Sequence, residues 1–540
     1  MTVRESHKAT RAEAASLRPS RPVRPPESGI ARASRKLHAA MEARPQLDYT
    51  MIRTIVLILA GLGIVMVMSS SMATSFAVSS SVWSQALRQT VMVSVGLFAF
   101  WVALNTPPEK LRRFSGLIMA LAVLLLIAVL IPGIGTGKEE VGSQSWIVVG
   151  PLRLQPSEVA RVAIAIWGAQ VLAGRDPKRL FKANNGFPLF LIVAFICVLL
   201  IAAQGDLGMA VSFSIVVAFI LLFAGVSWTA IGIAAIGGLL VMVFEFLSGG
   251  FRSNRFHVYF DALFGKFEDT RGVAFQSHQG FLSLADGSLF GVGLGQSRAK
   301  WFYLPEARND FIFAVIGEEL GLWGGALVII LFALLGYFGL RTARRAQNQF
   351  QALMAAALTA GVVSQAFINI GYVVGLLPVT GIQLPMLSAG GTSAIITLAG
   401  MGVLASVARH EPDAISSMQN HGRPTFDRVL GIAEPKAPAQ LKAARRPVRE
   451  RPARARRSAA ARWPAAAGWP AAAQPAAHGT ATASHPAAAP PCPPAPGPRG
   501  PLRYAGGGGE PSVGTQGPAL RWPATRTLRG HAPRGLSLPD

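Results

Sequence analysis

The chain has 540 residues, of which 51% are hydrophobic and only 14% are charged. A mean hydropathy of +0.40 is too apolar for a soluble protein of this length, and the net charge of +24 shows that the charged minority is mostly basic. These values exclude an ordinary soluble enzyme and favour a membrane protein.

Apolar segments long enough to cross a bilayer recur along the chain. A helix needs about 20 residues to span about 30 Å of hydrocarbon, and a backbone in lipid must satisfy its own hydrogen bonds, which favours helices over an open sheet. The sequence therefore predicts an all-α polytopic membrane protein with about ten transmembrane helices. We expect these helices at residues 52–74, 84–103, 115–132, 157–173, 187–203, 208–225, 228–247, 311–339, 352–377 and 392–408.

Lys and Arg indicate the orientation of these helices, because cytoplasmic connections are enriched in both. Basic residues precede the first helix and follow the second, fourth and eighth. Both termini are therefore expected in the cytoplasm, and the alternate connections face outward. The outward connections are 75–83, 133–156, 204–207, 378–391 and the large extracytoplasmic loop at 248–310.

The two ends of the chain differ in composition from its middle. Residues 1–50 and 410–540 are rich in Arg, Pro, Ala and Gly, and they cannot bury enough surface to offset the entropy of ordering. We expect a disordered basic arm and a disordered basic tail on either side of a membrane domain at 51–409, with the tail dispensable for chemistry. Aromatic residues are not interleaved as stacking platforms, so membrane lipids or acidic cytoplasmic partners are expected rather than nucleic acid. A plain solvated tether remains an equal alternative.

Polar residues placed against the membrane are the candidates for function, because burying them there is costly. The first stretch is "SWIVVGPLRLQPSEVARVAIAIW", residues 145–167, in which Glu158 and Arg161 are three residues apart and share a helix face. The pair is either an internal ion pair or part of a substrate cleft, and spacing leaves both open.

The second stretch is "GVGLGQSRAKWFYLPEARNDFIFAVIGEELG", residues 291–321. Lys300 and Arg308 add positive charge beside Glu306 and Asp310. Asp310 begins an apolar helix, where it is either a helix cap or a functional acid.

The third stretch is "NIGYVVGLLPVTGIQLPMLSAGGTSAIITLAG", residues 369–400, which holds the amide of Asn369 inside an apolar helix. Its "SAGGTSA" segment forms either an anion seat at a helix start or a self-capped turn. The residues concerned are Ser388, Gly390, Gly391 and Thr392.

Together these three stretches resemble the signature blocks of the SEDS family of shape, elongation, division and sporulation proteins, in the same order, over residues 50 to 410. The wording of the second and third stretches is most similar to division-type members from actinobacteria, with elongation-type members the close alternative. The resemblance implies a peptidoglycan glycosyltransferase that polymerises lipid II into nascent glycan at the outer face of the cytoplasmic membrane. It also implies a class B penicillin-binding transpeptidase as partner, and division-site proteins reached through the cytoplasmic tails at the septum.

Within this resemblance, Asp310 matches the essential aspartate of the family and is the expected general base of an inverting transfer. Glu158 and Arg161 match a Glu-x-x-Lys pair in which the cation has changed. Arg308 and Asn309 stand where the family usually has His-Thr.

The departing diphosphate needs positive charge, which Arg153, Arg161 and Lys300 could supply, with a divalent ion such as Mg or Mn as a further source. Backbone contacts are expected from the Gly-Gly-Thr segment. Glu318 and Glu319 are expected to orient the site or to hold helices together.

Two other classes of function stay open at this point. Paired charges inside broken helices are also what transporters use, so a lipid II flippase is an alternative. A non-catalytic scaffold that recruits division proteins through its tails is another.

Overall fold

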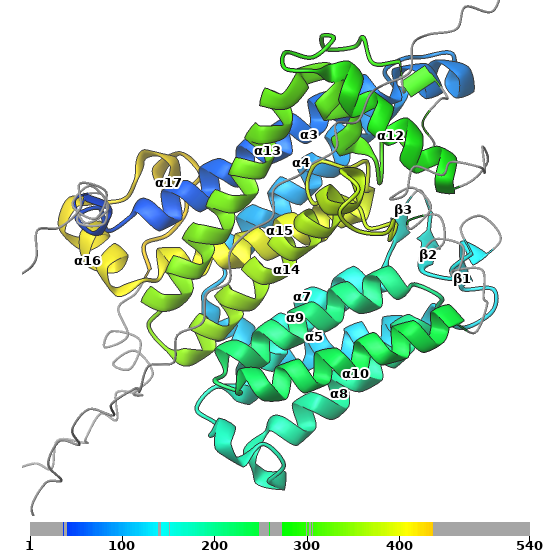
Figure 1. Ribbon diagram of the computed structural model, residues 1–540. Helices are drawn as coiled ribbons and strands as arrows, with labels where there is room; N and C mark the ends of the chain where they lie inside the picture. Colours follow the sequence, from blue (N-terminus) through cyan, green and yellow to red (C-terminus); the bar gives the residue numbers. More distant parts are fainter. Residues whose placement is uncertain are drawn as a thin grey trace, which may run out of the picture. The chain divides into compact units, whose positions relative to one another are not determined.

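The computed structural model describes residues 40–138, 142–150, 152–247, 273–298, 300–301 and 306–435, with single positions at 36, 259 and 304. Helices form at all ten places that hydropathy predicted (Figure 1). They are α3 (Leu47–Ser79), α4 (Ser84–Asn105), α5 (Pro108–Ala128), α7 (Pro156–Leu172), α8 (Phe187–Ala203), α9 (Leu207–Phe223), α10 (Trp228–Leu247), α13 (Ile312–Arg345), α14 (Gln349–Val373) and α15 (Gly391–Arg409).

Six of these helices are long and apolar enough to cross a membrane, counted over the described residues: α3, α4, α5, α13, α14 and α15. α8, α9 and the first part of α10 are shorter apolar helices. The all-α membrane fold is thus confirmed, while a total of about ten spans stays a prediction.

The helices form two neighbouring groups (Figure 1). In the first, α3, α4 and α13 surround α15 and α14; in the second, α5, α7, α8, α9 and α10 lie together. α14 joins the groups because it packs against both α7 and α9.

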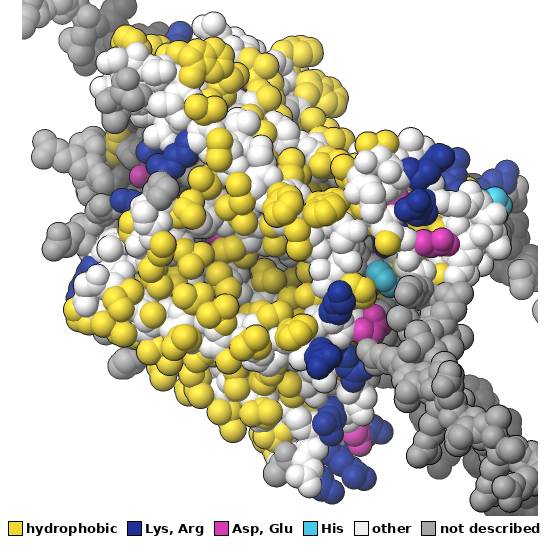
Figure 2. Space-filling view, turned by 180° about the vertical axis from the view of Figure 1, so that it is seen from behind, with side chains coloured by type: hydrophobic (Ala, Val, Ile, Leu, Met, Phe, Trp, Pro, Cys, Tyr) yellow, Lys and Arg dark blue, Asp and Glu magenta, His cyan; other side chains and the backbone are white. Residues whose placement is uncertain are grey.

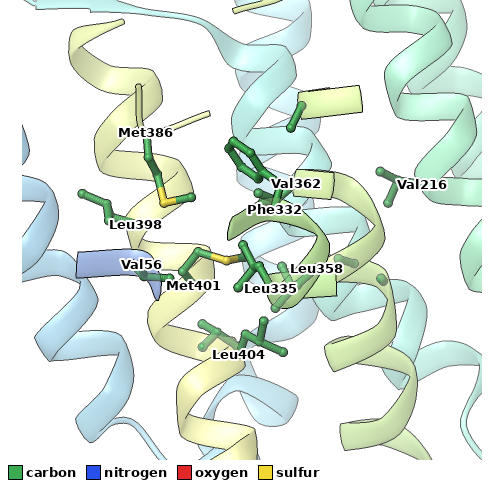
Figure 3. Packing of buried hydrophobic residues seen from close by; sticks show 14 of the residues in the cluster. Val56, Val216, Phe332, Leu335, Leu358, Val362, Met386, Leu398, Met401 and Leu404 are labelled. Carbon is green, nitrogen blue, oxygen red and sulfur yellow. The ribbon is translucent and has the colours of Figure 1, made fainter. Parts of the chain in front are cut away.

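The apolar core of the first group is built from long side chains that meet between α3, α13, α14 and α15. Figure 3 shows Met401 and Leu404 of α15 beside Leu335 of α13 and Leu358 of α14, and all four are buried or nearly so. On the outside, hydrophobic side chains cover much of the face in Figure 2, while Lys and Arg gather near its margins. An apolar exterior is what a lipid environment requires.

A small sheet interrupts the all-α pattern in the connection before α7. Strands β1 (Gly135–Thr136), β2 (Trp146–Val149) and β3 (Leu152–Leu154) pair antiparallel in the order β1-β2-β3. The sequence predicted only an outward connection at residues 133–156, because strands of two to four residues are too short to show alternation. β3 leads directly into α7 and so fixes where that helix begins.

The large outer loop holds one more helix within its described part, α12 (Val273–Gly287), which packs against α13. α13 itself is broken at Gly321, whose φ of 67° and ψ of −165° lie outside the helical region. A Cβ at this position would lie 2.4 Å from the Gly291 nitrogen, so only glycine fits there. The sequence predicted an unbroken helix here, because one glycine in an apolar run is not by itself a break.

The beginning of the tail is folded, which corrects the expectation of disorder from residue 410. Residues 410–435, called here the C-terminal clamp, include α16 (Pro412–His421) and α17 (Thr425–Val429). Asp427 of α17 is fully buried, where it accepts hydrogen bonds from Tyr49 Oη at 2.6 Å and from Arg409 Nε at 2.7 Å. Polar contacts with helix ends, rather than apolar periodicity, hold this segment, so its composition did not reveal it. The tail beyond residue 435 and the arm before residue 36 lie outside the described residues.

The first residue after α15 and its cap, Glu411, links the clamp to two other helices. Its carboxylate lies 3.3 Å from Arg345 Nε, and Arg345 also lies 3.8 Å from Asp48. Burial raises the pKa of Glu411 to about 8, and the neighbouring charge of Asp48 adds to the rise while Arg345 opposes it.

We expect Glu411→Gln to remove part of the pH dependence of stability. The folded state keeps a proton on Glu411 up to about pH 8, whereas an unfolded chain releases it at about pH 4.5, so stability falls as pH rises between these values. Between about pH 6 and pH 9 the wild type should lose about 3 kcal/mol more than the variant. Thermal unfolding in detergent at both pH values measures this, with the exposed Glu434→Gln as control. Equal pH dependence of wild type and Glu411→Gln would contradict the expectation.

Candidate functional site

Asp310 lies in the turn that leads into α13. The segment before α15 forms hydrogen bonds with the main chain of this turn. The carbonyl of Arg308 accepts a hydrogen bond from the Ala389 amide at 2.9 Å. The carbonyl of Asn309 accepts one from Ser388 Oγ at 2.6 Å. Asp310 itself is half-buried.

The carbonyl of Asp310 is held by α14. Asn369 Nδ2 donates to it at 2.8 Å and Tyr372 Oη lies 2.9 Å from it. Both side chains also reach the carbonyl of Ile382, at 2.7 and 2.8 Å. Three successive carbonyls, 308 to 310, are therefore fixed, and the backbone at the acid is pre-positioned.

The sequence did not predict that Asn369 would bind the main chain of the Asp310 turn. The sequence marked it as a polar amide inside an apolar helix, and the structure buries it fully, with its side chain bound to the Asp310 carbonyl. Tyr372 was missed, although a signal existed: it stands three residues after Asn369, and hence on the same helix face.

We expect Tyr372→Phe to lower the turnover number about tenfold with little change in KM. The variant keeps the ring but loses the hydroxyl that contacts the Asp310 and Ile382 carbonyls, so the acid is less well positioned. Initial rates of the glycan formation that the sequence resemblance implies, measured against substrate concentration, give both constants. Tyr337→Phe, on α13 and away from this turn, is the matched control. A raised KM with an unchanged turnover number would contradict a positioning role.

The segment before α15, which includes Ser388 and Gly390, packs closely against its neighbours. Ser388 is buried and also accepts from the Leu384 amide at 2.8 Å. Gly390 is the N-cap of α15, and a Cβ there would lie 2.0 Å from Gln383 Oε1. Gly391 is the first residue of α15, and Thr392 Oγ1 donates to the carbonyl of Arg153 at 2.5 Å. The Gly-Gly-Thr motif thus joins the helix start to the end of β3.

Glu158 and Arg161 are both buried in α7, at 1% and 5% exposure. They share a helix face, as predicted, but within the described part of the chain each side chain binds a different helix. Glu158 Oε1 accepts from Ser393 Oγ of α15 at 2.6 Å, and Arg161 lies 3.4 Å from Ser212 Oγ of α9. Among the residues that the structure describes, Glu158 Oε2 is buried and has no hydrogen-bond partner.

The residue that the sequence missed here is Ser393. It follows Thr392 directly, and together they tie the start of α15 to β3 and to α7. The run from Ser388 to Ser393 therefore links two clusters, one around Asp310 and one around Glu158.

The other predicted residues are spread around these clusters. Glu306 is exposed, has a φ of 54° and binds the Asn309 side chain through its own carboxylate. Arg308 is half-buried and Arg153 is exposed. Lys300 is buried, with its Nζ 3.5 Å from Glu319 Oε1.

The described residues contain no group of three or more His, Cys, Asp and Glu side chains that could hold a metal ion. A divalent cation therefore stays a prediction.

Comparison with known proteins gives the family. The model of the FtsW/RodA/SpoVE family, described as cell cycle proteins, matches residues 49–413. The chain belongs to the FtsW/RodA/SpoVE family. The resemblance to SEDS proteins is thus confirmed, and the matched range ends inside the C-terminal clamp.

Among the relatives, the probable peptidoglycan glycosyltransferase FtsW of Mycobacterium tuberculosis is 39% identical over 426 residues, which cover 76% of this chain and 79% of that protein. Stage V sporulation protein E of Bacillus subtilis is 36% identical over 368 residues, or 66% of this chain and 95% of that one. The likeness to an actinobacterial FtsW confirms the division-type resemblance within the FtsW/RodA/SpoVE family.

A solved structure of a peptidoglycan synthase complex contains a chain with the same fold, at a TM-score of 0.54 and 23% identity. The match covers 67% of this chain and 97% of that one. The shared fold and the apolar helices agree with a multi-pass membrane protein.

Proposed function

We propose that this chain is a peptidoglycan glycosyltransferase that polymerises lipid II at the outer face of the cytoplasmic membrane. Relatives named as peptidoglycan glycosyltransferases at 39% identity support this activity. The observation that carries it is the Asp310 turn, in which three successive carbonyls are bound by α14 and by the segment before α15.

The reaction moves one glycosyl group. An acceptor hydroxyl attacks the anomeric carbon of a polyprenyl-linked sugar diphosphate, the carbon–oxygen bond to the diphosphate breaks, and the hydroxyl proton passes to the Asp310 carboxylate. Attack opposite to the leaving group inverts the anomeric carbon. The half-buried position of Asp310 suits a general base, because partial exclusion of solvent helps a carboxylate to take up a proton.

The departing diphosphate gains from positive charge nearby. Arg153 and Arg308 are the predicted cations that are not fully buried, and their main chains bind Thr392 and Ala389 on the same short segment. Glu158 then serves to hold α7 beside the start of α15, and Arg161 to hold α7 beside α9. Lipid-linked substrates enter sideways from the bilayer.

Septal wall synthesis is the proposed cellular role, since relatives named FtsW favour division over elongation. A class B penicillin-binding transpeptidase is the proposed partner. The solved complex with the same fold is titled for the coordination of polymerization and crosslinking.

A lipid II flippase is the alternative from another class. Vesicles that contain the purified chain and labelled lipid II separate the two activities. Glycan polymer on a gel supports the glycosyltransferase, whereas movement of label between leaflets with no polymer supports the flippase.

Both termini are proposed to lie in the cytoplasm, with the site outside. A periplasm-dependent reporter inserted at Phe290 should be active, and the same reporter after Arg345 or at residue 440 should be inactive. Activity at residue 440 would mean an odd number of spans and would contradict the proposed orientation.

A further inference from the structure

Backbone groups at the break in α13 form hydrogen bonds with the outer loop. Gly321 leaves the helical conformation, and the carbonyls of Glu318 and Glu319, just before the break, bind the loop. They accept hydrogen bonds from the Val292 amide at 2.9 Å and the Gly293 amide at 3.0 Å. The Leu322 amide, beyond the break, donates to the Ser288 carbonyl at 2.9 Å.

The two carboxylates next to the break bind the same loop. Glu318 accepts from Ser297 Oγ and from the Arg298 amide, both at 2.6 Å. Glu319 accepts from Ser69 Oγ of α3 at 2.6 Å, and its Oε1 faces Lys300 Nζ at 3.5 Å.

These groups are deeply buried, at 1% exposure for each glutamate and 3% for Lys300. A charge buried next to lipid is retained only where it is paired and hydrogen-bonded. Lys300 also donates to the Gly295 carbonyl, so its ammonium joins the loop to α13. We call this set of contacts, from residue 288 to Lys300, the outer-loop latch.

The latch and Asp310 lie at opposite ends of one short helix. Residues 312–320 form a short helix between the Asp310 turn and the break at Gly321. α14 and the segment before α15 hold the first end, as described above. The latch holds the second, so a tilt of this short helix would displace the carboxylate at its start.

We propose that Lys300 and Glu319 form a positioning pair that closes the outer-loop latch and thereby sets the place of the Asp310 carboxylate. The inference rests on the glycosyltransferase function proposed above, and it gives Lys300 a role other than the diphosphate contact expected from the sequence. Loss of the lysine leaves Glu319 buried without its cation, which opens the latch. In the double variant both charges are lost. The neutral amide at position 319 can still accept a hydrogen bond from Ser69 Oγ, so the latch closes again.

Four variants test this pair in the full chain: Lys300→Met, Glu319→Gln, the double variant, and Lys182→Met as control on the exposed cytoplasmic side. We expect Lys300→Met to lower the turnover number about a hundredfold with KM changed less than about threefold. The double variant should recover at least about tenfold of that loss. Hydrogen exchange of the amides in residues 288–298 should quicken in Lys300→Met and return toward the wild-type rate in the double variant.

A diphosphate-binding lysine behaves differently. In that case KM rises, the double variant is no better than Lys300→Met, and exchange in the loop is unchanged, which would overturn the proposal. If Lys300→Met does not fold, Glu319→Gln decides the question, because it removes the partner of Lys300 and keeps the lysine. Faster exchange in residues 288–298 with lowered turnover and little change in KM supports the pair, whereas unaltered exchange and normal turnover overturn it. Polymerisation that is absent in the wild type would refute the proposed function, while the exchange data still decide whether Lys300 and Glu319 close the latch.

Discussion

Replacing Asp310 by asparagine or alanine is expected to abolish glycan polymerisation while the protein still folds and binds lipid II. The contacts that hold this turn are made to main-chain carbonyls of residues 308 to 310, so they survive a change of side chain. What the variant loses is a group that can accept the proton of the acceptor hydroxyl. Loss of a general base costs on the order of a hundredfold or more in rate.

The comparison needs a carboxylate from the same outer region as control. Asp286 in α12 is exposed, and Asp286→Asn should polymerise at the wild-type rate. Initial rates and lipid II binding are measured on the same preparations. Near-normal polymerisation by Asp310→Asn would reduce Asp310 to a residue that merely starts a helix.

Truncation should give a sharp boundary within the tail. A chain that ends at residue 435 keeps the C-terminal clamp and is expected to retain stability and polymerisation. A chain that ends at residue 411 loses Asp427, which leaves Arg409 and the Tyr49 hydroxyl buried without their partner. Removing one member of a buried ion pair costs about 3–5 kcal/mol, so folded yield in detergent should fall steeply.

Asp427→Asn in the full chain separates the charge from the rest of the clamp. It should lower the thermal unfolding temperature in the same direction as the shorter truncation, whereas the exposed Asp413→Asn should have a much smaller effect. A chain ending at 411 that unfolds at the same temperature as the intact protein would contradict the role of the clamp. This boundary revises the sequence-based expectation that everything after residue 411 is dispensable for chemistry.

The helices could be predicted because lipid imposes a strong and local requirement. A span must be apolar over about 20 residues, and this condition placed α8 at residues 187–203, where the structure has it. The break in α13 could not be found in this way. It depends on how Gly291 approaches Gly321, two residues whose contact follows from the folded loop and not from hydropathy.

In the candidate site, too, some features could be predicted from the sequence and others depend on tertiary contacts. A polar amide in an apolar helix marked Asn369 as unusual, but its role depends on the carbonyls of Asp310 and Ile382, which no spacing rule connects to it. Lys300 was predicted as a cation for the substrate because its charge was visible, while its burial against Glu319 was not. Sequence patterns identified residues that need an explanation, but the contacts of these residues become visible only in the folded structure.

Incubation of the purified chain alone, in detergent, with labelled lipid II tests the proposed activity most directly. Detergent removes the second leaflet, so transport across a membrane cannot produce a signal. We expect a ladder of glycan polymers from the wild type and none from Asp310→Asn at equal lipid II binding. Wild-type protein that binds lipid II but leaves it unpolymerised, with and without a class B transpeptidase partner and divalent cations, would contradict the assignment as a glycosyltransferase.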